Sequence, residues 1–134
     1  MTIYQGNDSK KISGGIRRPS RKKRKYELGG YPTQTKIGSR DVRVKERVRG
    51  GGVVVRARVV AYANIYDPEA RTYRKARILK VVENRANREY VRLGIVTRGA
   101  LVETELGLAQ ITSKPSRDGV VNAVLIKAGG QARQ

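Results

Sequence analysis

The side chains with the clearest chemistry lie in residues 10–25, a 16-residue run with the sequence KKISGGIRRPSRKKRK. The run holds nine Lys or Arg and no Asp or Glu, so its charges repel one another until a polyanion neutralises them. Both residue types neutralise phosphates, and Arg also forms bidentate bonds with phosphate and stacks on bases. Gly14 and Gly15 let the backbone approach a phosphate closely. We expect insertion into nucleic acid; a solubilising tail or a localisation signal is the alternative.

A second set of cations alternates along a predicted strand at residues 42–49. Alternate residues of a strand stand about 6.6–6.8 Å apart, so these side chains would form a ladder of positive charge. A solvated face normally mixes signs, whereas the only nearby acid, Glu46, is expected to point to the opposite side. We therefore favour a nucleic-acid surface over a merely solvated face. The predicted ladder consists of Arg43, Lys45, Arg47 and Arg49, widened by Arg56 and Arg58 on the next strand.

Catalytic chemistry is poorly represented in the chain. His and Cys are absent, which removes the commonest acid–base groups, nucleophiles and thiolate metal ligands. Glu103 and Glu105 would share one strand face, but a solvated edge explains them better than a phosphoryl- or glycosyl-transforming centre. No Gly-rich stretch continues into the Lys-Ser or Lys-Thr of a phosphate-binding loop. The sequence predicts no catalytic residue, metal site, cofactor or small-molecule substrate.

The tyrosines fall into two groups. Tyr26 and Tyr31 lie near the basic run, where a base could stack on them, although Tyr26 could equally dock onto the folded body. Tyr62, Tyr66 and Tyr73 flank a predicted central turn, and we expect them to pack as hairpin pairs.

The positive charge is spread over the whole chain of 134 residues, whose net charge is +19. Residues 1–38 carry ten basic and two acidic groups, and residues 39–134 carry twenty and nine. A nucleic-acid partner is therefore expected to contact both parts. No apolar stretch is long enough to span a bilayer, and no amphipathic stripe suits a membrane surface. We expect a cytoplasmic protein that does not bind membranes.

The composition of the sequence and the spacing of its apolar residues change near residue 40. Gly and Pro interrupt residues 1–40, which predicts an extended basic arm that is mostly disordered in isolation. Residues 41–127 hold short alternating segments separated by glycine turns, which predicts an all-β fold, a small antiparallel β-barrel or sandwich. Residues 128–134 are expected to be a flexible end.

The strands of the body can be placed approximately. Gly50 to Gly52 predict a turn, residues 64–71 a second turn, and residues 83–89 a single helical turn. Between Ile78 and Leu79 the apolar positions change face, which predicts a β-bulge. Because Phe and Trp are absent, Val, Ile, Leu and some of the tyrosines are expected to fill the core. The predicted strands cover residues 42–49, 53–62, 72–82, 90–96, 100–105, 108–113 and 120–126.

Several segments resemble a known family. They are KKISGGIRRPSRKKRKYELGG at residues 10–30, TKIG at 35–38, VRVKERVRGGG at 42–52, ARILKVVENRANRE at 76–89 and TSKPSRDGVVNAVLIK at 112–127. In these segments and their order, the chain resembles the archaeal and eukaryotic small-subunit ribosomal protein family S8e. Its short length resembles the archaeal members.

The resemblance implies a β-barrel-like body seated on small-subunit ribosomal RNA, with the basic arm running into the RNA. It also implies neighbouring small-subunit ribosomal proteins, a monomer within the ribosome, no enzymatic activity and no cofactor. A general nucleic-acid-binding or DNA-compacting chromatin protein remains the alternative. The residues expected to bind RNA are Lys10, Lys11, Gly14, Gly15, Arg17, Arg18, Arg21, Lys22, Lys23, Arg24, Lys25, Tyr26 and Lys36, together with the six residues of the ladder.

Overall fold

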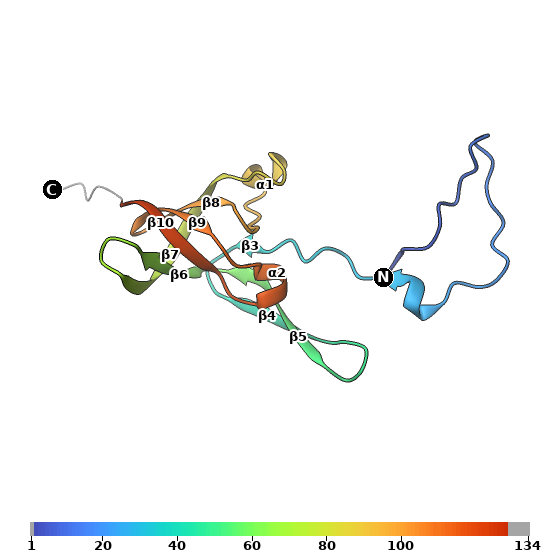
Figure 1. Cartoon of the computed structure of the whole chain (residues 1–134), viewed down its shortest axis with the longest axis horizontal. Coiled ribbons are helices and arrows are strands. Elements are labelled where there is room, and N and C mark those ends of the chain that lie inside the picture. Colours follow the sequence, from blue (N-terminus) through green and yellow to red (C-terminus); the bar gives the residue numbers. More distant parts are fainter. Residues whose placement is uncertain (1, 129–134) are drawn as a thin grey trace. The chain divides into compact units, whose positions relative to one another are not determined.

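Figure 1 shows a computed structural model of the chain, which describes residues 2–128. Internal contacts divide the chain into one unit that ends at Pro32 and a second that begins at Thr33. The predicted boundary at residue 40 lies later than this division. The Thr35 side chain is buried and its hydroxyl donates to the Ala57 carbonyl at 2.6 Å, so the segment after Thr33 packs with the second unit. Of the predicted flexible end, all but Ala128 lies outside the described residues.

A closed five-stranded barrel forms the centre of the second unit (Figure 1). Its strands follow one another around the barrel and pair antiparallel, except that the first and last pair in parallel. An odd number of alternating strands requires this, because the first and fifth run in the same direction. The prediction of a small all-β barrel is confirmed. The strands are β6 (Tyr62–Asp67), β7 (Thr72–Glu83), β8 (Leu101–Thr104), β9 (Gly107–Ile111) and β10 (Asn122–Ala128).

The barrel interior is filled by Ala, Val and Ile side chains that alternate along the strands with exposed residues. No tyrosine is buried, so the expectation that tyrosines help to fill the core is wrong. Five strands enclose a narrow space that small aliphatic side chains fill and aromatic rings do not fit. The core cluster includes Ala63, Ile65, Ala76, Ile78, Val81, Val102, Ala109, Ile111 and Ala123.

The predicted bulge in the long strand β7 is confirmed. The pairing of β7 with β8 shifts register between Ile78 and Lys80, and again between Val81 and Glu83. Leu79 is 54% exposed, whereas Val81 is buried together with Ile78. The first shift therefore returns Val81 to the interior, although strict alternation would place it outside.

A three-stranded sheet precedes the barrel, with β5 (Val53–Val60) between β3 (Lys36–Ile37) and β4 (Val42–Arg47). The predicted turn joins β4 to β5, and Gly50 and Gly51 adopt φ angles of 84° and 85°, which favour glycine.

The predicted strand at residues 53–62 is interrupted at Ala61. The Ala61 amide donates to Asp41 Oδ1 at 2.7 Å, outside the strand ladders, and β6 begins at the next residue. Residues 64–66 continue β6, so the second predicted turn begins later than residue 64 and is shorter. In that turn Asp67 Oδ1 accepts the Glu69 amide at 3.0 Å.

Two short helices, α1 (Glu89–Arg92) and α2 (Pro115–Asp118), complete the second unit. The predicted strand at residues 90–96 is wrong, and the predicted helical turn lies after residues 83–88 rather than within them. The Asn87 side chain accepts the Glu89 amide at 2.9 Å, which favours a helical turn despite the apolar alternation. Within the described part of the chain, neither helix is long and apolar enough to cross a bilayer.

The first unit is a loop whose two ends pair with each other. β1 (Ile3–Tyr4) pairs antiparallel with β2 (Leu28–Gly29), which follows a 3₁₀ turn at Lys25–Glu27. The Gln5 amide donates to the Glu27 carbonyl at 2.8 Å. The basic run lies between these paired ends, and its residues Lys10 and Ile16 form an isolated bridge.

We expect Gly119→Ala to lower the free energy of unfolding of the second unit by roughly 2–4 kcal/mol. Gly119 has φ of 73°, and an added Cβ would lie 3.0 Å from the Val55 carbonyl oxygen, so α2 could not pack as closely on β5. Gly99→Ala is the matched control, because Gly99 has φ of 82° and open space around it. The free energy of unfolding of Gly99→Ala should fall by only about 1–2 kcal/mol. Equal losses in chemical denaturation would show that the close approach at Val55 contributes nothing.

Candidate nucleic-acid interface

The basic run of the first unit is exposed and has no hydrophobic core of its own. Every residue from 10 to 26 is exposed, including Ile12 and Ile16, the only large aliphatic residues of the run. The apolar contribution to order is therefore small, and the structure of the first unit depends on backbone pairing at its ends and on polar contacts. Eight of the nine cations have no acidic partner among the described residues and are available to an external anion, and the ninth, Arg21, binds Glu27.

The contacts of Glu27 fix the end of the basic run. Its Oε2 accepts the Arg24 amide at 3.1 Å, and its Oε1 forms a short ion pair with Arg21. The hydrogen bond from the Arg24 amide, followed by the Arg21 guanidinium, holds the pKa of Glu27 below its usual range. The same carboxylate raises the pKa of Arg21.

Two tyrosines of the first unit lie beside cations. The Arg21 guanidinium carbon is 5.8 Å from the centroid of the Tyr26 ring, and Lys23 Nζ is 4.9 Å from that of Tyr4. Tyr26 is 63% exposed, so an aromatic surface next to a guanidinium is presented to solvent. Such a pair can take a base on the ring and a phosphate on the cation.

Part of the predicted ladder of positively charged side chains is present in the structure. Register places Arg43, Lys45 and Arg47 opposite Ala57, Val55 and Val53, so these three share one face of the β4–β5 hairpin. Arg49 lies beyond the strand, in the turn.

One of the two cations of β5 lies outside the ladder. Arg56 lies opposite Val44 and therefore occupies the other face, so its predicted place in the ladder is wrong. Arg58 is the extra residue of β5 at a register shift, between the partners of Val42 and Arg43. Alternation along β4 correctly predicted the shared face of Arg43, Lys45 and Arg47, but alternation alone does not predict how β4 pairs with β5.

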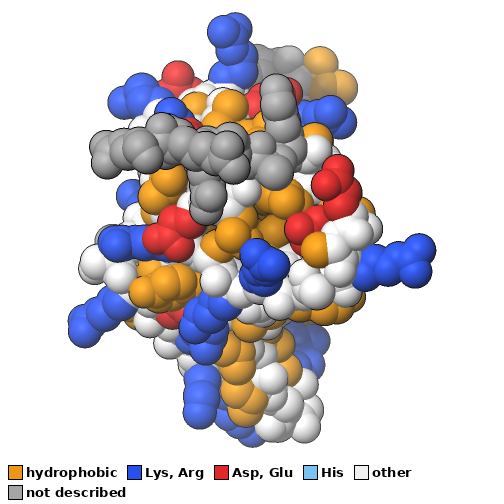
Figure 2. All heavy atoms as spheres, turned by 90° about the vertical axis from the view of Figure 1, so that its left-hand side faces the viewer, with side chains coloured by type: hydrophobic (Ala, Val, Ile, Leu, Met, Phe, Trp, Pro, Cys, Tyr) orange, Lys and Arg blue, Asp and Glu red, His pale blue; other side chains and the backbone are white. Residues whose placement is uncertain are grey.

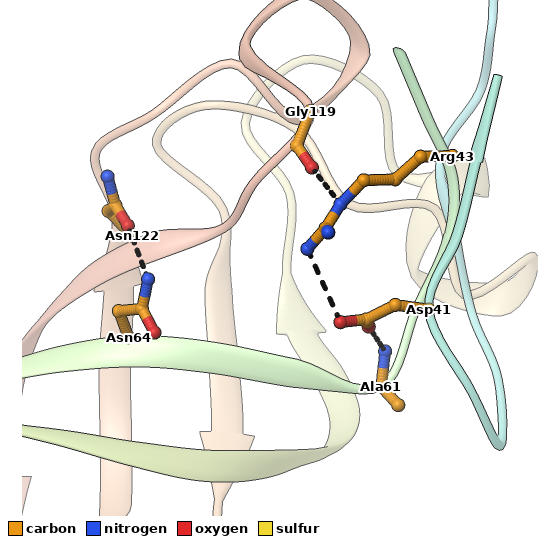
Figure 3. A network of polar contacts seen from close by, with 6 residues as sticks. All are labelled: Asp41, Arg43, Ala61, Asn64, Gly119 and Asn122. Carbon is orange, nitrogen blue, oxygen red and sulfur yellow. Dashed lines mark hydrogen bonds and ion pairs between the residues drawn. The ribbon is translucent and has the colours of Figure 1, made fainter. Parts of the chain in front are cut away.

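Two of these guanidinium groups are bound by the protein itself. Arg43 Nε donates to the Gly119 carbonyl at 2.8 Å, and its terminal nitrogen lies 3.6 Å from Asp41 (Figure 3). Asp41 in turn accepts the Ala61 amide, so the network joins β4, the end of α2 and the start of the barrel. Sequence reasoning missed these roles of Asp41 and Gly119, because the residues they join are far apart in the chain.

Arg56 has a similar structural role on the opposite face. Its Nε lies 2.7 Å from Glu46 Oε2 and a terminal nitrogen donates to the Ser116 carbonyl at 3.0 Å. Glu46 therefore points away from the ladder, as predicted. The side chains of Lys45, Arg47 and Arg49 have no acidic partner among residues 2–126, and these three form the available part of the ladder.

Positive charge dominates the remaining surface as well. Residues 2–126 contain five ion pairs, which leaves most of their basic side chains without an acidic partner. In Figure 2, Lys and Arg side chains project from much of the visible face, and acidic side chains are fewer. This surface is suited to a polyanion.

The acidic residues considered for catalysis are not arranged as a pair. Glu103 lies on β8 and its carboxylate is 2.9 Å from Lys80 Nζ. Glu105 lies in the following turn and accepts the Arg77 amide at 3.3 Å. Among the described residues, no group of three acidic, His or Cys side chains is placed to hold a metal ion.

The prediction that the hairpin tyrosines pack as pairs is confirmed for two of the three. Tyr66 on β6 lies directly opposite Tyr73 on β7, with ring centroids 4.9 Å apart and a tilt of 40°. The Tyr62 ring lies beside Lys75, whose Nζ is 4.8 Å from the ring centroid. All three rings lie on the outer surface of the barrel.

Sequence comparison identifies the family to which this basic chain belongs. Residues 4–126 match the sequence model of ribosomal protein S8e. The chain belongs to the ribosomal protein S8e family. Two archaeal relatives named small ribosomal subunit protein eS8 are those of Hyperthermus butylicus, 56% identical, and Sulfolobus acidocaldarius, 52% identical. Their alignments cover 95% of this chain and 94% and 99% of the relatives.

A third relative of the same name, from Saccharolobus solfataricus, is 47% identical over 98% of both chains. Membership of the S8e family confirms the resemblance noted in the sequence. It also confirms the prediction of a structural ribosomal protein rather than an enzyme.

Removing the charge of Glu27 should loosen the end of the basic run. The pKa of Glu27 is lowered in the folded unit, so its stabilising contacts are present above the pKa of the unfolded chain. They are lost as the pH falls through the lower, folded pKa. We expect the Arg24 amide resonance to shift in acid, and to shift at neutral pH in Glu27→Gln, as followed by ¹⁵N NMR. Glu89→Gln, which removes the exposed pair with Arg92, should leave this resonance unchanged. An unshifted Arg24 amide in Glu27→Gln would contradict the assignment.

Proposed function

We propose that this chain is a structural constituent of the small ribosomal subunit in the cytoplasm, where it binds and stabilises small-subunit ribosomal RNA. The observation that carries the proposal is the match to the S8e family over residues 4–126, with relatives named for the small subunit. The exposed basic run and the three available cations of the β4–β5 hairpin supply two RNA-binding surfaces.

The basic run binds RNA by neutralising phosphates and releasing condensed counterions, which makes the affinity fall steeply with salt. Ordering of the backbone on binding costs about 1–2 kcal/mol per residue, so many phosphate contacts must offset it. The pairing of β1 with β2 reduces this cost because it already holds the two ends of the run together.

The barrel and its hairpin give the bound protein a fixed orientation. Lys45 and Arg47 lie on one face of the hairpin and Arg49 follows in its turn, so the three can contact phosphates of an RNA backbone. The major groove of A-form RNA is too narrow for side chains to read, so recognition is mainly of RNA shape. In the assembled subunit the protein acts as a monomer among other ribosomal proteins and requires no cofactor.

The first test asks whether the protein is an integral component of the small subunit. Sucrose-gradient fractionation of native extract, before and after a high-salt wash, should show stoichiometric retention with small subunits by quantitative mass spectrometry. Release into the free pool, or sedimentation with DNA, would contradict the proposal and favour the general nucleic-acid or chromatin alternative.

The second test assigns the binding to the basic run. Five substitutions by Gln in the full chain, at Arg17, Arg18, Lys22, Lys23 and Lys25, retain the contacts of Arg21 and Glu27. We expect the slope of log affinity against log salt for small-subunit RNA to flatten by about 3.5–4.5 if all five cations contact phosphate.

The matched control for this test removes the same charge from the second unit. It replaces by Gln five exposed cations that have no acidic partner among the described side chains, Arg85, Arg88, Arg98, Lys114 and Arg117. A smaller change of slope is expected for the control. Equal flattening in both variants would show that net charge matters rather than the basic run.

A further inference from the structure

A groove with a volume of about 530 Å³ lies on the outer surface of the barrel, where β6 meets β7 on one side and β10 on the other. Neither the basic run nor the ladder contributes to it. Its lining contains no Asp or Glu. The residues that give it chemical character are Asn64, Tyr66, Tyr73, Arg74, Lys75 and Asn122.

The wall of the groove formed by β6 and β7 carries an aromatic platform. Tyr66 is half-buried and packs against Tyr73 with ring centroids 4.9 Å apart, which orders the outer ring. Tyr73 is nevertheless 79% exposed, so much of its surface is open to a ligand. A pre-ordered, exposed tyrosine loses little side-chain entropy on stacking and accepts any planar base.

A pair of amides lies beside this platform, across the parallel seam of the barrel. Asn64 Nδ2 donates to Asn122 Oδ1 at 3.2 Å (Figure 3). The Asn122 backbone is fixed on both sides, because its amide donates to Ser113 Oγ at 2.9 Å and its carbonyl accepts the Thr112 amide at 2.9 Å.

This amide pair has unused hydrogen-bonding capacity. Asn64 Oδ1 and Asn122 Nδ2 have no partner among residues 2–126, and both side chains are exposed. Together they present one acceptor and one donor group. The hydrogen-bonding edge of each nucleobase carries an acceptor and a donor in the same way, so the pair can bind the edge of a base.

Arg74 and Lys75 supply positive charge to the same groove. Neither has a carboxylate partner among the described residues, and Lys75 Nζ is 4.8 Å from the centroid of the Tyr62 ring. An acidic group on the ligand would therefore meet two uncompensated cations. Stacking, edge hydrogen bonds and cations occur together in sites for single-stranded nucleic acid.

We propose that this groove binds an unpaired nucleotide of an RNA strand. The base stacks on Tyr73, its edge bonds to the amides of Asn64 and Asn122, and a neighbouring phosphate lies near Arg74 or Lys75. The choice of RNA as the strand rests on the proposed function, whereas the geometry of the groove is independent of it. The protein then has a site for unpaired RNA in addition to surfaces that follow paired backbone.

The proposal is tested with the full chain, a single-stranded RNA decamer and an RNA duplex ten base pairs long. In Tyr73→Leu the affinity for the single strand should fall about 5- to 150-fold, since one stacking platform is lost. The affinity for the duplex should change less than about twofold, because the basic run is intact. Tyr62→Phe is the control, at a tyrosine on the same outer surface that does not line the groove; it keeps the ring beside Lys75 and should bind both RNAs like the parent.

A second variant and a mapping experiment keep the test decisive. Asn64→Ala removes the amide pair at an exposed position. It should also lower the affinity for the single strand while leaving the affinity for the duplex nearly unchanged. Photo-crosslinking of a decamer containing 4-thiouridine should label the peptides that carry Tyr66 and Tyr73. Unchanged single-strand affinity in both variants, with crosslinks confined to residues 10–25, would overturn the groove proposal and leave the proposed function intact. Absence of binding to either RNA by the parent protein would instead overturn the proposed function.

Discussion

The parallel pairing of β6 with β10 is the contact on which the second unit depends, because without it the five strands form an open sheet with two bare edges. The seam sets Asn64 opposite Asn122 and Ile65 opposite Ala123, so one residue pair faces solvent and the next faces the core. Closing a barrel with only five strands leaves a narrow interior, which accounts for its Ala, Val and Ile content. The tyrosines are consequently on the outside, where two of them form a platform beside the seam.

The cations divide into those that hold the protein together and those that remain available. Arg43 and Arg56 each donate to a backbone carbonyl near α2 and also meet a carboxylate, so they connect the β4–β5 hairpin to the segment that precedes β10. Lys45 and Arg47 on the same strands have no such partners among the described residues. In residues 2–32 nearly all the positive charge is available, since Arg21 is the one cation there with an acidic partner. The cations that stabilise the fold and those that remain available are thus different members of one highly basic set.

Sequence patterns predicted features that depend on neighbours in the chain. The barrel class, the glycine turn, the bulge after Ile78 and the pairing of Tyr66 with Tyr73 all follow from alternation and turn chemistry, and the structure contains each of them. Features that depend on distant partners were predicted wrongly or missed. Arg56 was assigned to the ladder because its face depends on strand register, and the strand break at Ala61 depends on a bond to Asp41, 20 residues earlier. The groove joins residues 58 positions apart, which no local pattern reveals.

The order of the strands has a consequence for synthesis of the protein. At about 5–20 residues per second, the 58 residues that separate Asn64 from Asn122 take roughly 3–12 s to be added to the growing chain. During that interval β6 has emerged without the partner that closes the barrel, and its edge is open to non-native pairing. The basic loop, which precedes every strand of the barrel, is complete before this interval begins. A nascent chain therefore presents its basic loop well before the barrel can close.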